Sequence, residues 1–313
     1  MNKHILTFLL SVSLIPLIAI NTACSNTLNK TDHPGFTIAG QINDKRIKES
    51  SGLAYSTRSE RVLWTINDSG NKAEIYAINV KGERLGTVKL KGVKNKDWED
   101  ISSFKYQGKS YLLIADVGDN KAKRDSLSLH FIKEPQLKRL SKNNKLKISP
   151  AWSIDFSYED GPRDCESVAV NMTDQQVMLL SKRNHPPVLY QLPLVNHSNK
   201  GKQIAKRVMP LSNLPPANPT DITNLKHMAF NGQPTAMDIS QDGKSAIVLT
   251  YVRAYYFYNP QANNSRDVFQ TKPHIIDLPY LEQAEAISFG SNNQTVFITS
   301  EGRPAPLLRL NLM

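Results

Sequence analysis

One short phrase recurs five times along this chain and constrains its fold more than any other feature. Its pattern is an acidic or small polar residue, a variable residue, an aliphatic residue, and then Ala or Ser. The five copies begin at Ser51, Glu99, Glu166, Met237 and Glu285. A pattern that returns at intervals of tens of residues predicts a fold made of repeated units, each packed against the next.

Two further apolar runs of strand length follow each copy, in a fixed order. The second runs cover residues 62–66, 111–115, 177–181, 246–250 and 296–299, and the third cover 74–80, 127–132, 188–194, 254–258 and 307–310. There is little helical periodicity. Three strands in the same order, five times over, predict an all-β fold consisting of a single β-propeller. A β-sandwich would not repeat a strand triplet.

The fourth, outer strand of each blade is the least regular part of the repeat. We expect it at residues 87–90, 152–158, 204–209 and 274–278. No sequence remains for it after Leu312, so residues 36–42 are expected to complete the last blade and close the ring, which hides the sheet edges. Residues 136–150 and 211–233 are expected to be loop insertions. Five blades is the economical count, and six is the alternative if residues 211–233 contain part of another blade.

The start of the chain resembles a bacterial lipoprotein signal. Residues 5–20 form a short apolar run, and small residues lead to Cys24, where such signals are cleaved and the cysteine is lipidated. We therefore expect removal of residues 1–23, lipid such as palmitate on Cys24, a tether over residues 24–34, and one propeller domain over residues 35–313.

This signal also predicts where in the cell the protein is located. Ser25 favours the outer membrane, with the domain facing the periplasm and held to the membrane only through its lipid. Asn21 stands where such signals usually have Leu. The alternative is ordinary cleavage after Ala23, which would give a soluble secreted protein.

Charge and cysteine content limit the partners. Cys165 is the only cysteine besides Cys24, so no intramolecular disulfide is expected, and a lone buried cysteine behaves as a small hydrophobe. The formal net charge of +11 is compatible with an anionic small molecule or surface, or with an envelope protein. Nucleic acid is excluded as a partner because the basic residues are scattered and the compartment is wrong.

Polar and charged residues gather where the second strands end and where the inner strands begin. Because loops of several blades converge on one face of a propeller, we expect these residues at the mouth of its central channel. The expected ligand-binding residues are Asn67, Asp68, Asp97, Asp119, Asn120, Arg183, Arg253 and Glu301. Turn formation is the alternative role for Asp68, Asp119 and Asn120, whose residue types turns favour.

Several carboxylates in one cavity need arginine, a shared proton or a hard cation to offset their repulsion. Oxygen ligands suit Ca²⁺ or another divalent cation, and Glu is unusual in strands yet recurs here at one register. The expected metal ligands are Glu99, Asp116, Glu166 and Glu285, and Asp100 is the candidate general base. Ser51 and Met237 take the Glu register in the other two copies, so the acids are expected on one side of the channel.

The motifs of residues 49–54, Asp97-Trp98-Glu99-Asp100 and Gly118-Asp119-Asn120 together resemble those of a family of exported bacterial β-propeller proteins. The resemblance covers nearly all of residues 45–312 and implies the fold and export. It implies no substrate, because that family has no established activity.

More distantly, the chain is similar to phytase-like and gluconolactonase-type propellers, which hold a divalent ion through channel-facing carboxylates. That role would fall on Glu99, Glu166 and Glu285. Two functions follow as expectations. The first is an envelope propeller that binds a ligand or partner at its channel mouth. The alternative is a divalent-metal-dependent hydrolase of the phosphoesterase or lactonase type.

Overall fold

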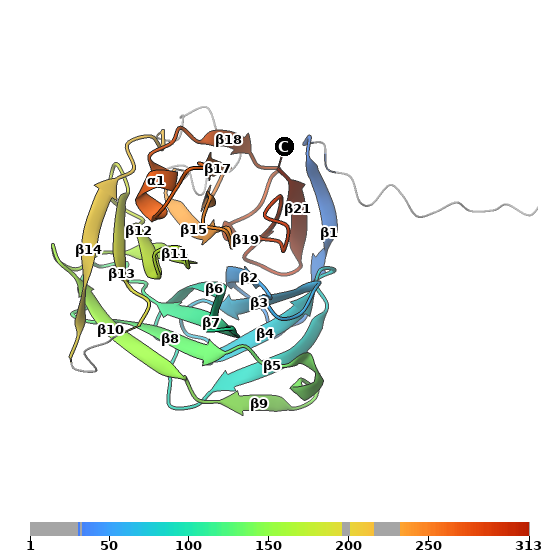
Figure 1. Cartoon of the computed structure of the whole chain (residues 1–313). Helices are drawn as coiled ribbons and strands as arrows, with labels where there is room; N and C mark the ends of the chain where they lie inside the picture. Colours follow the sequence, from blue (N-terminus) through green and yellow to red (C-terminus); the bar gives the residue numbers. More distant parts are fainter. Residues whose placement is uncertain (1–30, 32, 196–200, 216–231, 313) are drawn as a thin grey trace, which may run out of the picture.

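The computed structural model describes residues 31, 33–195, 201–215 and 232–312. They form an all-β molecule in which four hydrogen-bonded sheets surround a common centre, the arrangement of a β-propeller (Figure 1). The helices among these residues are α1 (Ser265–Phe269) and one 3₁₀ turn at Leu137–Arg139. None of the described helices is long and apolar enough to span a membrane.

Two of the sheets hold the first thirteen strands after β1 in the chain. The first has the order β2 (Ser50–Tyr55), β3 (Val62–Asn67), β4 (Glu74–Asn79), β5 (Arg84–Leu90), β9 (Lys145–Ile148). The second has the order β6 (Trp98–Tyr106), β7 (Lys109–Asp116), β8 (Leu127–Lys133), β10 (Trp152–Tyr158), β14 (Gln203–Pro210), β13 (Val188–Pro193), β12 (Gln176–Ser181), β11 (Cys165–Asn171). It consists of two antiparallel groups of four, which the parallel pairing of β10 with β14 joins into one sheet.

The other two sheets complete the ring. One has the order β15 (Pro234–Ile239), β16 (Ser245–Thr250), β17 (Arg253–Tyr258), β18 (His274–Asp277). The last has the order β19 (Ala284–Phe289), β20 (Thr295–Ser300), β21 (Ala305–Asn311), β1 (Phe36–Ile42). In it β1 pairs antiparallel with β21, from Phe36 opposite Leu310 to Ile42 opposite Ala305. The predicted closure of the ring by an N-terminal strand is confirmed.

Five inner strands, β2, β6, β11, β15 and β19, lie next to one another around the centre, and β19 returns to β2. Most of their residues are buried, because both faces of each sheet are covered by neighbouring sheets. Trp64 and Trp98, both completely buried, belong to one of the apolar clusters that fill the space between adjacent sheets. The predicted order of the strands along the chain is also confirmed.

A β-bulge interrupts each inner strand near its start. Pairing with the second strand skips one residue in every case, and the skipped residues are Ser51, Glu99, Glu166, Thr235 and Glu285. A bulge leaves its extra residue out of the ladder and re-aims the side chain. The expectation that Met237 occupies the register of Glu99 is therefore wrong, because Thr235, two residues earlier, is the bulged residue of β15.

Asp100 connects three inner strands. Its Oδ1 accepts from its neighbour Ile101 N at 2.8 Å, and its Oδ2 accepts from Val168 N on β11 at 2.8 Å and from Met237 N on β15 at 3.4 Å. The side chain is completely buried. Inner strands share no backbone ladder with one another, so a carboxylate that accepts from the adjacent strand β11 and from β15 beyond it helps to hold the ring together.

The structure corrects one insertion and leaves other predictions outside its range. Residues 136–150 are not a plain loop, because β9 pairs in parallel with the outer strand β5 and extends the first sheet. Residues 216–231 of the second expected insertion lie outside the described residues, as do the signal, Cys24 and most of the tether.

Replacing Asp100 with Ala should destabilise the fold strongly. Three buried or nearly buried backbone N–H groups would lose their acceptor, and each such loss costs about 1–3 kcal/mol, so we expect the free energy of unfolding in urea to fall by about 3–5 kcal/mol. Asp277→Ala is the matched control, since that carboxylate is largely exposed on β18, and a loss below about 1 kcal/mol is expected there. Equal losses in the two variants would contradict this role for Asp100.

Candidate functional site

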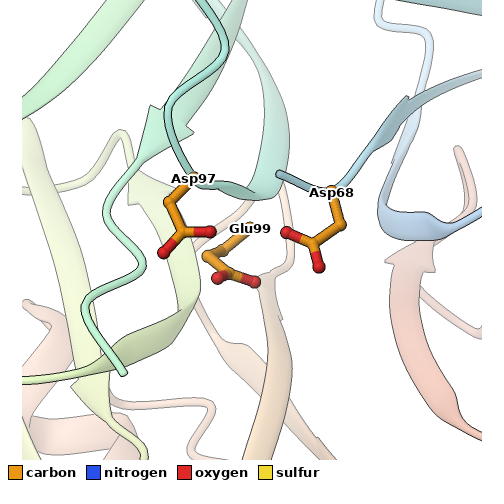
Figure 2. A group of neighbouring side chains, drawn as sticks. All are labelled: Asp68, Asp97 and Glu99. Carbon is orange, nitrogen blue, oxygen red and sulfur yellow. The ribbon is translucent and has the colours of Figure 1, made fainter. Parts of the chain in front are cut away.

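The clearest cluster of functional groups lies at the end of the channel where the inner strands begin. Carboxylate oxygens of Asp68, Asp97 and Glu99 all lie within 4.8 Å of one another. Figure 2 shows the three side chains turned toward one region, with Asp68 coming from the loop after β3, Asp97 from the residue just before β6, and Glu99 from the start of β6. Glu99 is the bulged residue of β6, which explains why its side chain leaves the ladder.

Asn95 holds the two elements of this cluster together. Its Nδ2 donates to the carbonyls of Asn67 and Asp68 at 3.0 and 2.9 Å, and its Oδ1 accepts from Trp98 N at 3.1 Å. One amide side chain therefore fixes the end of β3 against the beginning of β6. Asn67 is fixed as well, because its side chain bonds only backbone groups of residues 46, 48 and 49.

Gly118 makes the room that the cluster needs. A Cβ at this position would lie 2.1 Å from Glu99 Oε1 and 2.5 Å from the carboxyl carbon of Asp97. The Gly118 N–H donates to Asp97 O at 3.2 Å. The first residue of the Gly118-Asp119-Asn120 motif is thus required by close approach to the acids.

The three acids are poorly compensated. Glu99 is 6% exposed, and its carboxylate makes no hydrogen bond or ion pair with the described residues. Burial raises its pKa well above the usual range, and the charges of Glu166, Asp68 and Asp97 add to this effect. Burial also raises the pKa of Asp68 to about 6 and, against the charge of Arg124, that of Asp97.

Glu166 shares the mouth with a buried lysine. Lys182 Nζ is paired with Glu166 Oε1 and bonds Tyr251 OH at 3.1 Å. Burial raises the pKa of Glu166 to about 8, although the Lys182 charge lowers it. Burial acts to lower the pKa of Lys182, but the charge of Glu166 outweighs it and raises that pKa.

A hydrogen-bonded chain continues from this pair to the last inner strand. Tyr251 OH donates to Glu285 Oε1 at 3.2 Å. Gln283 Nε2 bridges Glu285 Oε1 at 2.7 Å and Glu301 Oε2 at 2.8 Å. Burial, with the Glu285 charge, raises the pKa of Glu301 to about 10. Lys182 is therefore the one buried lysine, within the part of the chain that the structure describes, beside the six acids Asp68, Asp97, Glu99, Glu166, Glu285 and Glu301.

Several residues expected at the site have other partners. Arg124 pairs with Asp116 at 2.6 Å, so that expected metal ligand is offset by an ion pair. Asp119 accepts from the N–H groups of residues 123 and 124, which is the turn-forming role. Asp100 accepts backbone N–H groups, as described above, and has no access to the channel as a general base.

Two of the expected arginines are also engaged. Arg183 Nε lies 2.8 Å from Asp164 Oδ2, and its guanidinium contacts exposed Asn120 at the rim. Arg253 pairs with Asp277 on the outer strand β18 at 2.7 Å.

Sequence reasoning missed Lys182 and Tyr251. The first residue after each of the five second strands, β3, β7, β12, β16 and β20, marks the same place, and these residues are Asp68, Val117, Lys182, Tyr251 and Glu301. Alignment of the second-strand ends would have found Lys182 and Tyr251 in place of Arg183 and Arg253, which lie one and two residues further on.

Three comparisons with known proteins were informative to different degrees: two found similar proteins and one found none. A family profile described as SdiA-regulated matches residues 32–304. No curated protein matches the sequence. Among solved structures, a gluconolactonase of Xanthomonas campestris is similar over 89% of each chain, with 14% identity and a TM-score of 0.44.

The pKa shifts predict that the chelator-treated protein loses stability as the pH rises. Asp68 and Glu166 have folded-state pKa values of about 6 and 8, above the ordinary 3.8 and 4.5. The folded state therefore binds more protons than the unfolded state in this range, so the free energy of unfolding should fall between about pH 4.5 and 8. Urea unfolding in EDTA at several pH values measures it. The double variant Asp68→Asn/Glu166→Gln should show a flatter profile, and wild-type stability that rises toward pH 8 would contradict the assignment.

Proposed function

The chain belongs to the SdiA-regulated family, and we propose that it is a five-bladed, exported propeller whose channel mouth binds a hard divalent cation and, beside it, an oxygen-rich anionic ligand. Five blades are supported by the five inner strands, each followed by its own antiparallel strands, and by the closing strand β1. Export with a lipid on Cys24 rests on the sequence of residues 1–24 alone.

The observation that carries the cation proposal is Glu99. A nearly buried carboxylate that has no partner among the described residues and lies within 4.8 Å of two other carboxylates is unfavourable unless a proton or a cation neutralises it. Asp68, Asp97 and Glu99 would hold the cation, and Gly118 keeps the space beside them open. Ca²⁺ suits the site better than Mg²⁺, because it accepts many oxygen ligands in flexible geometry.

The surroundings support an anionic ligand. A cation bound through three carboxylates on one side retains coordination positions for further oxygens. Lys182 lies in the same mouth, and Arg183 and Asn120 stand at its rim. A small molecule with carboxylate or phosphate groups, or an acidic segment of an envelope protein, would meet both the cation and these donors.

Hydrolysis is the second candidate, and Glu166 is the observation that favours it. A pKa of about 8 lies near the value at which a carboxylate serves as a general base at neutral pH. A bound cation would polarise a phosphoryl or carbonyl oxygen, while Glu166 would accept a proton and Lys182 would hold an anionic group of the substrate. The buried, fully bonded Asp100 is not available for this role.

Thermal unfolding with and without cation tests the proposal. Ca²⁺ at 100 times its dissociation constant should add about 2.7 kcal/mol to the free energy of unfolding of the EDTA-treated protein. The double variant Asp68→Asn/Glu99→Gln should lose this stabilisation, because it removes two ligand charges. Asp277→Asn, which removes a largely exposed charge from the outer strand β18, should keep it. No stabilisation by millimolar Ca²⁺ or Mg²⁺ would contradict a cation site.

Turnover separates the two candidate functions. If the site is hydrolytic, a phosphate monoester or a lactone should be consumed only with cation, and Glu166→Gln should lower kcat by about 100-fold while leaving the Ca²⁺-induced thermal shift in place. Turnover no higher than that of Asp68→Asn/Glu99→Gln would exclude the hydrolase and leave the binding function.

A further inference from the structure

A second candidate site lies at the opposite end of the ring from the acids. A cleft of about 650 Å³ opens between the sheet that contains β1 and the sheet that contains β4. Its lining includes Tyr55, at the far end of β2 from Ser50, and the turn between β19 and β20. Ser50 pairs with Asn67, next to the acid cluster, so the cleft and the acids lie at opposite ends of the same strands.

The charges of this cleft all have one sign. Arg61, Lys81 and Arg309 line it, and none of its other described lining residues is Asp or Glu. None of these three side chains forms an ion pair or hydrogen bond with the described residues. The three side chains are exposed, so solvent weakens their mutual repulsion, and a bound anion would be attracted by all three at once. The volume is within the range of small-molecule sites, which lies at about 300–1,000 Å³.

The backbone under the cations is fixed. Arg61 has a left-handed φ of 60°, its N–H donates to Tyr55 OH at 2.8 Å, and its carbonyl accepts from Val80 N at 3.2 Å. A non-glycine residue adopts this conformation only when its surroundings hold it there. These contacts set Arg61 at the edge of the cleft.

Lys81 is held by the closing strand. Gln41 N on β1 donates to Lys81 O at 3.1 Å. The two segments approach so closely that a Cβ on Gly40 would lie 2.1 Å from Lys81 O, and one on Gly82 would lie 2.4 Å from Gln41 O. Arg309 lies within β21, between β1 and β20. Hydrogen bonds or strand pairing therefore fix the backbone of all three cationic residues.

The wall of the cleft offers an apolar surface and a hydroxyl donor. The rings of Tyr55 and Phe297 stack with centroids 5.8 Å apart, and the two residues are 8% and 6% exposed. Tyr55 OH accepts from Arg61 N, which leaves its own proton free to donate. An anion with a sugar or apolar body would contact the rings while its charge meets the cations.

We propose that this cleft binds a phosphate monoester, as a free sugar phosphate or as the headgroup of a phospholipid. Phosphate is the anion that fits best, because it carries close to two charges and several acceptor oxygens, matching three cations and a hydroxyl donor. The site is independent of the cation site, since it shares none of its residues.

Isothermal titration of the whole protein in EDTA tests the proposal. Glucose 6-phosphate is the soluble probe, and glucose is its uncharged control. Vesicles of phosphatidylcholine with phosphatidic acid, against phosphatidylcholine alone, form the lipid arm. We expect saturable binding of at least one phosphate probe and none of its control. Binding of the sugar phosphate identifies a free ester as the source, and binding of vesicles alone identifies a headgroup.

Two charge-matched variants localise the binding. Lys81→Gln/Arg309→Gln should weaken it by about tenfold or more. Lys89→Gln/Lys105→Gln removes the same charge from exposed residues outside the cleft and should change it less than twofold, and Arg309→Lys should retain most of it. No saturable binding of either probe, or equal weakening in the two double variants, would overturn the proposal. EDTA keeps this test separate from that of the cation site.

Discussion

The β-bulge near the start of every inner strand is the constraint on which the channel mouth depends. The extra residue in each strand cannot join the ladder, so its side chain is turned out of the sheet. Where that residue is small, it is used for assembly: Ser51 Oγ donates to Trp98 O at 3.0 Å, and Thr235 Oγ1 donates to Ala284 O at 2.7 Å. Where it is Glu99, Glu166 or Glu285, a carboxylate is delivered to the channel. The same backbone irregularity thus links neighbouring inner strands in two cases and places a carboxylate at the channel mouth in the other three.

Charge is distributed along the strands as well as around the ring. The acids meet where β2 and β19 begin, and the unpaired cations meet where these strands end. A basic chain would be expected to neutralise its acids internally, yet among the described residues Lys182 is the one buried lysine at the mouth, while Arg124 and Arg183 pair with Asp116 and Asp164. Keeping these carboxylates ionised at neutral pH therefore lowers the stability of the fold. Such a loss of stability is typical of sites where a bound ligand offsets it.

The sequence predicted most of the fold and part of the site. The order of the strands, the four outer strands and the closure by residues 36–42 were readable because each strand carries its own apolar run and turn signals. Glu99 was readable because Glu is rare in strands. The role of Thr235 could not be predicted. The sequence Asp238-Ile239-Ser240 matches Asp100-Ile101-Ser102, but the structural equivalents of these residues lie two positions earlier in β15. Nor could β9 be predicted, because its short alternating run resembles a loop.

What the sequence determined by itself is the repeat, and with it a closed ring of sheets, because strand periodicity and turn chemistry are local properties of the chain. Only the tertiary structure decided which acids share a cavity. Asp68 and Asp97 are 29 positions apart, and the Asn95 amide holds their two segments together. Asp116 instead forms an ion pair with Arg124, and Asp100 accepts hydrogen bonds from backbone N–H groups. Partners of this kind are set by packing between sheets, and a carboxylate's chemistry depends on them more than on its place in a motif.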